Sequence, residues 1–221
     1  MTRVYLVRHG QASFGSANYD QLSELGQLQA NLLRQSWQAQ GVTIDRVYAG
    51  ALIRQIQTAQ IASGVELSDV AQLAVFDEYP FHQLFELTTP SSATDWRRVS
   101  KQTFRESLVA LFDQDIDRVL EDAAMLSWSG FRQRCHQGLL ELLKSGDQPQ
   151  TLAVFSSAGV IGAITQALTG SNDAEAARFA FSLYNSAVTE LQFDHNTLSL
   201  VSFNQTEHLD QSQGLALYST L

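Results

Sequence analysis

Short runs of apolar residues alternate along this chain with longer segments in which apolar residues recur at every third or fourth position. The runs are rich in β-branched and aromatic residues and stop at turn signals, as buried strands do; they are 4–7, 46–49, 73–76 and 151–155. The longer segments have the spacing of helices with one apolar face; they are 25–37, 53–62, 104–112, 131–143 and 160–168. The pattern therefore predicts strands and helices in alternation.

The last two apolar runs differ from the others because only a short turn separates them. Residues 187–193 and 198–203 flank the turn residues of DHNT, which predicts a β-hairpin. Alternating strands and helices elsewhere favour a largely parallel sheet covered by helices on both faces. We expect a single α/β domain over residues 1–221, with a helical insertion at about 82–146 that lies over one edge of the sheet.

Polar residues follow three of the predicted strands at the point where each strand ends. Arg8 and His9 follow the first strand, Arg54 follows the second, and the segment 156–159 follows the strand at 151–155. In open sheets of this kind, ligands bind beyond the carboxyl ends of the strands. We expect these three segments to meet at one edge and form an anion site. A surface turn with two neighbouring polar residues is the alternative interpretation of Arg8 and His9.

Composition limits which ligands such a site can take. The chain has 221 residues, of which 44% are hydrophobic and 17% charged, as in ordinary globular proteins. Its formal charge of −9 argues against sequence-independent binding to nucleic acid or to anionic lipid. Any anionic ligand must therefore be held by a local cluster of arginines.

Cysteine and histidine usage argues against a disulfide framework and against a metal centre. Cys135 is the one cysteine, and its helical surroundings predict a buried, unreactive thiol rather than a reactive one. No Cys/His cluster has the spacing of a structural zinc site, and no apolar stretch is long enough to span a bilayer. The first residues lack a basic and apolar leader, so we expect a cytoplasmic protein without a membrane anchor.

Five segments in their order and spacing resemble the histidine phosphatase superfamily, also called phosphoglycerate mutase-like. They are LVRHGQ, LSELGQLQA, VYAGALIRQIQTA, VFSSAGVIGAI and NSAVTELQFD. The resemblance covers nearly the whole chain apart from the insertion. It implies the family fold, a mostly parallel central sheet between helices, and phosphoryl transfer that needs no metal or other cofactor.

The resemblance also implies roles for individual residues. His9 corresponds to the nucleophile that carries the phosphoryl group as phosphohistidine. Arg8 and Arg54 correspond to the arginines that clamp the phosphoryl oxygens, a task for which the planar guanidinium fork is suited. Gln11 and Ser13 either complete the phosphate cradle or are solvated loop side chains.

A leaving alkoxide needs a proton, and the family often places a glutamate after the third strand. The segment LAVFDEYPF offers Glu78 at this place, with Asp77 beside it. A general acid must reach the ester oxygen and have a raised pKa. We select Glu78 as the general acid; the alternative is that both carboxylates form a solvated acidic pair at a strand end.

The chain departs from the family pattern after the strand at 151–155. Where the family has SHGG, this chain has Ser156, Ser157, Ala158 and Gly159, so Ser157 replaces a second catalytic histidine and Ala158 a glycine near the substrate. A serine hydroxyl is a neutral and weaker donor than an imidazolium. Loss of one such donor costs on the order of 3 kcal/mol, or about a hundredfold in rate.

Two other groups are weighed as parts of the site. His82 lies close in sequence to Glu78 and either approaches the phosphate or is an ordinary loop histidine, the favoured interpretation. Arg97 and Arg98 resemble a segment that holds substrate in mutases of the family, but a solvated helical face is favoured. His136, His195 and His208 are expected to be structural, solvent-facing or without a readable role.

Together these residues predict a phosphatase that hydrolyses a small phosphomonoester through a phosphohistidine on His9. The alternative is a catalytically impaired protein of the same fold that binds phosphate esters or regulates, and Ser157 favours it. A mutase is less favoured, because mutases also need the second histidine to manage a bound bisphosphate.

Overall fold

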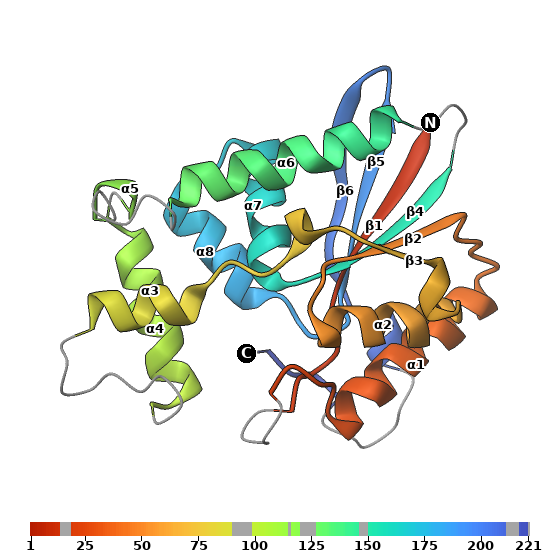
Figure 1. The fold of residues 1–221 in the computed structure, drawn as a ribbon, viewed down its shortest axis with the longest axis horizontal. Coiled ribbons are helices and arrows are strands. Elements are labelled where there is room, and N and C mark those ends of the chain that lie inside the picture. The colour runs from red at the N-terminus through yellow and green to blue at the C-terminus, as the bar shows by residue number, and fades with distance from the viewer. Residues whose placement is uncertain are drawn as a thin grey trace.

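The computed structural model of the protein describes residues 1–13, 19–89, 99–114, 116–119, 127–145, 150–210 and 217–220. At its centre is a six-stranded sheet with the order β3-β2-β4-β1-β5-β6 (Figure 1). The strands are β1 (Thr2–Arg8), β2 (Arg46–Ala49), β3 (Val70–Gln72), β4 (Thr151–Ser156), β5 (Val188–Asp194) and β6 (Thr197–Gln205). β1 to β4 run parallel, and β5 and β6 add an antiparallel hairpin beside β1. The predicted mostly parallel α/β architecture is confirmed.

Helices connect the strands and cover the sheet. They are α1 (Glu24–Ala39), α2 (Ile53–Ser63), α3 (Phe81–Thr88), α4 (Lys101–Phe112), α5 (Ile116–Val119), α6 (Trp128–Lys144), α7 (Ala158–Thr169) and α8 (Asp173–Ser182). Local signals set several ends: Ser23 caps α1 by accepting from the Gly26 amide, and Gly64 ends α2 with a φ of 74°. Within the described part of the chain, no helix combines the length and the apolar composition needed to cross a bilayer.

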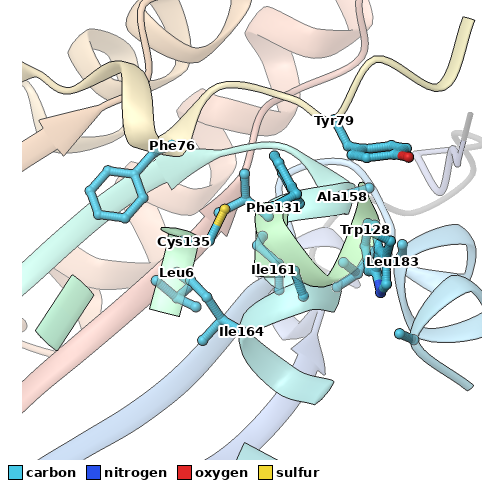
Figure 2. Packing of buried hydrophobic residues seen from close by; sticks show 14 of the residues in the cluster. Leu6, Phe76, Tyr79, Trp128, Phe131, Cys135, Ala158, Ile161, Ile164 and Leu183 are labelled. Atoms are coloured by element: carbon cyan, nitrogen blue, oxygen red, sulfur yellow. The ribbon is translucent and has the colours of Figure 1, made fainter. Parts of the chain in front are cut away.

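Alternate residues of the strands divide the core into two layers, because successive side chains of a strand point to opposite faces. Tyr5 and Val7 of β1 pack with α1 and α2 on one face. Val4 and Leu6 face the opposite layer, which α6, α7 and α8 cover. Figure 2 shows this second layer, with Leu6 near Ile164. Residues 4–7 of β1 are apolar toward both layers, as expected for a parallel strand buried on both faces.

The predicted strand at 73–76 is wrong. The third strand lies earlier, at Val70–Gln72, and residues Ala74–Phe76 form one turn of 3₁₀-helix. The apolar run arises because Phe76 is fully buried in the core, and a short apolar run does not distinguish a strand from a single helical turn. This turn directs the chain back over the end of the sheet, where Asp77 and Glu78 follow.

The segment after β3 supplies much of the core through α6. Trp128, Phe131 and Cys135 of α6 are buried in the same cluster as residues of the sheet (Figure 2). The Cys135 thiol donates to the Val75 carbonyl over 3.5 Å, and burial raises its pKa to about 12. The predicted burial of Cys135 is confirmed. The helices α3 and α5 lie within the predicted helical insertion but were not located individually. The sequence prediction lacks α8, which begins with an Asn172–Glu175 capping box that the apolar pattern does not reveal.

Candidate active site

The ends of β1, β2 and β4 lie level with one another at one edge of the sheet. Arg8 pairs with Ser156 across β1 and β4, and Ala49 pairs with Phe155 across β2 and β4. The His9 amide continues the ladder by donating to the Ser156 carbonyl over 2.9 Å. The sequence prediction that these strand ends meet is therefore correct. The alternative interpretation of Arg8 and His9 as a surface turn is wrong, because both residues are buried.

The hydrogen bonds of the His9 ring define one tautomer. Nδ1 lies 2.7 Å from the Gly10 carbonyl oxygen, which can only accept, so Nδ1 carries the proton. Nε2 receives the Nε–H of Arg54 over 3.1 Å, and a guanidinium can only donate, so Nε2 carries a lone pair. The ring is thus held with its proton on Nδ1 and its lone pair on Nε2.

Close backbone packing fixes the loop that carries His9. A Cβ added to Gly10 would lie 2.4 Å from the Gly26 carbonyl oxygen, so only glycine allows the loop to approach the start of α1 this closely. The Gly10 amide donates to Thr58 Oγ1 over 3.0 Å, and Asn185 Nδ2 donates to the His9 carbonyl over 3.1 Å. Contacts from α1, α2 and the segment before β5 therefore hold His9 in place.

The charge environment keeps His9 neutral. Burial, followed by the nearby Arg54 and Arg8, holds the pKa of His9 well below its ordinary value of 6.5. Only 5% of the residue is exposed. A neutral imidazole with its lone pair on Nε2 is the form required of a nucleophile.

Arg54 links His9 to an acidic residue that the sequence did not single out. Its Nη1 lies 2.5 Å from Asp20 Oδ1, and Asp20 Oδ2 accepts the Ile53 amide at the start of α2 over 2.8 Å. The Arg54 guanidinium also lies over the Tyr19 ring, 5.7 Å from its centroid. Asp20 thereby orients Arg54 toward His9.

Arg8 is a buried cation, and one of its N–H groups has no partner among the residues that the structure describes. Its Nη1 donates to the Leu183 carbonyl, while its Nε is buried and makes no hydrogen bond to any described residue. Burial lowers the pKa of Arg8 to about 10, and the group remains charged at neutral pH. An unpaired buried donor is costly, so a ligand that accepts this N–H would stabilise the site.

Glu78 lies at the N-terminus of α7. Its Oε1 accepts two backbone amides, those of Tyr79 and Gly159, each over 2.9 Å. A Cβ on Gly159 would lie 2.4 Å from this oxygen, so the glycine makes room for the carboxyl group. Burial raises the pKa of Glu78 above its ordinary value of 4.5, while Arg54, Arg8 and the two amides oppose that rise.

Ser157 directly follows β4 but does not line the cavity described below. It is fully buried, and its hydroxyl accepts from Gln55 Nε2 over 2.8 Å instead of capping α7. Ala158 is also buried. The backbone amide of Ser13 donates to the Gln21 carbonyl over 2.7 Å. None of Ser157, Ala158 and Ser13 is among the residues that line the cavity.

A cavity of about 440 Å³ opens in front of His9. From the part of the chain that the structure describes, it is lined by Arg8, His9, Gln11, Ala12, Tyr19, Asp20, Leu52, Arg54, Glu78, Tyr79, Pro80, Phe81, His82, Val99, Phe104, Asn185 and Thr220. The predicted candidates Gln11 and His82 are therefore at the cavity. Arg97 and Arg98 lie outside the described residues. No group of three His, Cys, Asp or Glu side chains within the described ranges is arranged to bind a metal.

Several cavity residues were missed because nothing near them in sequence marks them. Tyr19 and Asp20 lie before α1 and meet Arg54 only in the folded chain. Thr220 comes from the C-terminal end, which lies near this edge of the sheet (Figure 1). Asn185 begins NSAVTELQFD, one of the segments that carry the family resemblance, so its position could have been singled out.

The remaining histidines have no part in the cavity. His195 is exposed in the β5–β6 turn, with a φ of 46°. His136 is half-buried on α6. His208 is buried 2.7 Å from Ser186 Oγ, and burial lowers its pKa to about 4, so this residue has a structural contact that the sequence did not reveal.

Comparison with known proteins places this geometry in a family. Among solved structures, a mutant phosphoserine phosphatase from Entamoeba histolytica in complex with phosphoserine is 22% identical, with a TM-score of 0.66 over 95% of this chain and 100% of that one. Mycobacterial glucosyl-3-phosphoglycerate phosphatase with inorganic phosphate is 19% identical, with a TM-score of 0.62 over 94% and 99%. A putative α-ribazole-5′-P phosphatase from Escherichia coli is 19% identical, with a TM-score of 0.62 over 93% and 98%.

These structures share the fold of this chain, and no curated protein matches it. The family model of the histidine phosphatase superfamily (branch 1) matches residues 4–206. This range includes Arg8, His9, Arg54, Glu78 and the end of β4. The chain belongs to the histidine phosphatase superfamily.

Proposed function

We propose that the protein hydrolyses a small phosphomonoester through a phosphohistidine formed at Nε2 of His9. The observation that carries this proposal is the His9 ring, neutral and hydrogen-bonded so that Nε2 keeps its lone pair. Arg8 and Arg54 flank it with donors for the phosphoryl oxygens. The related structures bound to phosphoserine or inorganic phosphate support a phosphorylated small molecule as the ligand.

In the first step, Nε2 attacks phosphorus, the N–P bond forms and the P–O ester bond breaks. As the substrate enters, the Nε–H of Arg54 stops donating to His9 Nε2 and donates to a phosphoryl oxygen instead. The buried Nε–H of Arg8 gains a phosphoryl oxygen as its acceptor. The negative charge of the transferring group is thereby stabilised where it develops. Glu78, whose pKa is raised by burial, donates a proton from its acid form to the leaving alkoxide, so a neutral alcohol departs.

In the second step, water attacks the phosphohistidine on the face that the alcohol has left. The Glu78 carboxylate accepts a proton from that water, the P–N bond breaks, and inorganic phosphate is released. His9 returns to its neutral form and Glu78 to its acid form, so the cycle closes without a metal ion.

The second candidate function, a catalytically impaired phosphate-binding protein, rests on Ser157. Its hydroxyl accepts from Gln55 Nε2, and Ser157 is not among the described residues that line the cavity, so this position does not replace the family's second histidine. The enzyme is favoured because nucleophile, both arginines and the acid share one cavity. The missing donor lowers the expected rate and leaves the chemical steps intact.

Steady-state release of phosphate from phenyl phosphate distinguishes the two functions. We expect measurable turnover that His9→Ala abolishes, while His195→Ala, an exposed histidine in the β5–β6 turn, leaves it unchanged. Phosphate binding by calorimetry verifies that each variant keeps its cavity. Turnover that survives His9→Ala would rule out the proposed nucleophile, and tight phosphate binding without turnover in the wild type would favour the binding protein.

A further inference from the structure

The cavity has two ends of different chemistry, and the second end indicates the class of substrate. Resting on the proposed function, we propose that the alcohol part of the substrate is apolar, an alkyl or aryl group. Phosphorylated acids and polyols are then poor substrates. The inference rests on where the leaving group must lie and on which side chains line that end.

The position of the acid determines the direction of the leaving group. Glu78 must reach the ester oxygen, and that oxygen lies opposite His9 across phosphorus in an in-line displacement. The leaving group therefore extends toward the chain that follows Glu78. Four consecutive lining residues come from this chain, namely Tyr79, Pro80, Phe81 and His82, and the first three of them present aromatic or apolar surface.

Apolar residues from two other segments line the same cavity. Leu52, just before α2, contributes a partly exposed side chain. Val99 and Phe104, before and within α4, contribute two more, and both also pack against the main core. The apolar residues on this side thus come from segments far apart in sequence that the fold brings together.

The aromatic residues on this side are held in place by the core. The rings of Tyr79 and Phe81 lie edge to face with centroids 4.9 Å apart, and Tyr79 also packs 5.1 Å from Trp128 (Figure 2). The Phe104 ring lies 5.1 Å from Phe85 of α3. A preformed apolar surface binds an apolar group without a large ordering penalty, and its affinity rises with the area buried.

Several polar side chains of the cavity already have partners close to His9. Asp20 is paired with Arg54, and Asn185 donates to the His9 carbonyl while accepting from the Ser219 hydroxyl. Gln11 Oε1 accepts from Ser23. Of the described residues that line the cavity, the permanently charged cations are Arg8 and Arg54, which the phosphoryl group engages. Besides these and His9, the basic side chain in that lining is His82, and a second anionic group on the substrate would otherwise face mainly apolar residues.

A series of primary alkyl phosphates tests this inference, because the reacting group is the same throughout. From methyl to butyl to hexyl phosphate, we expect kcat/KM to rise by at least about tenfold in total, since each methylene adds buried apolar contact. O-phosphoserine and 3-phosphoglycerate should be poorer substrates than butyl phosphate. The phosphorus–carbon bond of methylphosphonate and hexylphosphonate is not hydrolysed. Their binding affinities, measured by calorimetry, therefore report the same apolar contact without turnover.

Variants locate the preference at this end of the cavity. Phe104→Ala should reduce the hexyl-to-methyl ratio in both kcat/KM and phosphonate affinity. Val99→Lys should do the same and improve the relative use of 3-phosphoglycerate, which provides a second test should Phe104→Ala fold poorly. Val201→Ala, at an exposed apolar residue of β6, is the matched control and should leave the ratio unchanged.

The outcomes separate this inference from the proposed function. Turnover with a hexyl-to-methyl ratio near one, or a preference for 3-phosphoglycerate, would overturn the apolar leaving group and leave the phosphatase intact. Tighter binding of hexylphosphonate than of methylphosphonate with no turnover of any ester would support the apolar end and overturn the phosphatase. A ratio that the Phe104 and Val99 variants do not change would also overturn the inference.

Discussion

The ends of β1 and β4 lie side by side at the same edge of the sheet, yet they use polar residues in opposite ways. After β1, the buried Nε–H of Arg8 has no partner among the described residues, and the Nε2 lone pair of His9 accepts only from Arg54 there. After β4, the Ser157 hydroxyl is fully buried and engaged by Gln55. Equivalent positions in a fold thus do not guarantee equivalent roles, because the neighbours of a side chain decide where it points.

The difference also indicates where the proposed function places its catalytic groups. In that proposal the β1 end, with Arg54, supplies the nucleophile and the cations. The β4 end and the start of α7 supply structural hydrogen bonds: the Gly159 amide donates to Glu78, and the Ser156 hydroxyl donates to the Phe76 carbonyl over 2.7 Å. We therefore expect substitutions at the first end to reduce rates, and substitutions at the second to act mainly on stability.

The largest effect is expected for Arg54. Arg54→Lys keeps the positive charge but loses the planar fork that contacts both His9 and Asp20. We expect kcat/KM to fall by about a hundredfold to a thousandfold, because a transition-state donor is lost and His9 loses its orienting partner. Arg178→Lys, at an exposed ion pair with Asp113, is the control and should have no effect. An Arg54→Lys variant with near wild-type kinetics would show that charge alone suffices.

The next effect concerns Glu78 and its pH dependence. Glu78→Gln should lower kcat by about a hundredfold, because the alcohol leaves without a proton. In the pH–rate profile, wild-type turnover should fall as pH rises through the raised pKa of Glu78, since only the protonated acid is active. The Glu78→Gln variant should not show this fall, the alkaline limb of the profile. Asp77→Asn is the matched control: its carboxylate accepts the Ala51 amide, and the pH limb should persist. A limb that persists in Glu78→Gln instead would refute the assignment.

The same carboxyl group links pH to stability. Because burial raises the pKa of folded Glu78 above 4.5, the folded state binds more protons than the unfolded state across that interval. This contribution is present below the unfolded pKa and is lost as pH rises through the folded pKa. We therefore expect the difference in melting temperature, Glu78→Gln minus wild type, to be more positive at pH 8 than at pH 4. An equal difference at both pH values would contradict the raised pKa.

The smallest change in rate is expected at the β4 end. Ser157→Ala removes the acceptor of Gln55 Nε2, which should lower the free energy of unfolding by about 1 kcal/mol. Turnover should stay within about threefold of wild type, since a hydroxyl that binds a transition state would account for about a hundredfold. Chemical unfolding and steady-state kinetics on the same samples give both quantities. A hundredfold loss of kcat without loss of stability would restore Ser157 as a catalytic group.

The reverse substitution sharpens the same comparison. Ser157→His combined with Gln55→Ala replaces the missing imidazole and removes the side chain that now engages this position. We expect kcat to rise by about tenfold, with little change in KM, because the added donor acts on charge that develops in the transition state. A folded double variant with unchanged kcat would show that the β4 end cannot take part in the reaction.

The sequence predicted the parts of this molecule that depend on local pattern. Buried strands and their polar ends are continuous in sequence, so the meeting of Arg8, His9 and Arg54 followed from the parallel sheet. The wrong strand at 73–76 arose because burial of Phe76, a tertiary contact, resembles a strand signal. The partners Asp20 and Gln55 were not predictable, because each depends on packing between segments that are distant along the chain.

The central claim is that Nε2 of His9 carries the phosphoryl group. The most direct measurement is to mix the protein with phenyl phosphate, quench in alkali, and locate the adduct by peptide mass spectrometry and ³¹P–¹⁵N NMR. The account predicts an acid-labile phosphoryl group on His9, bonded to Nε2 and absent from His9→Ala. Turnover without any His9 adduct, or a phosphoryl group on Nδ1 or on another residue, would contradict it.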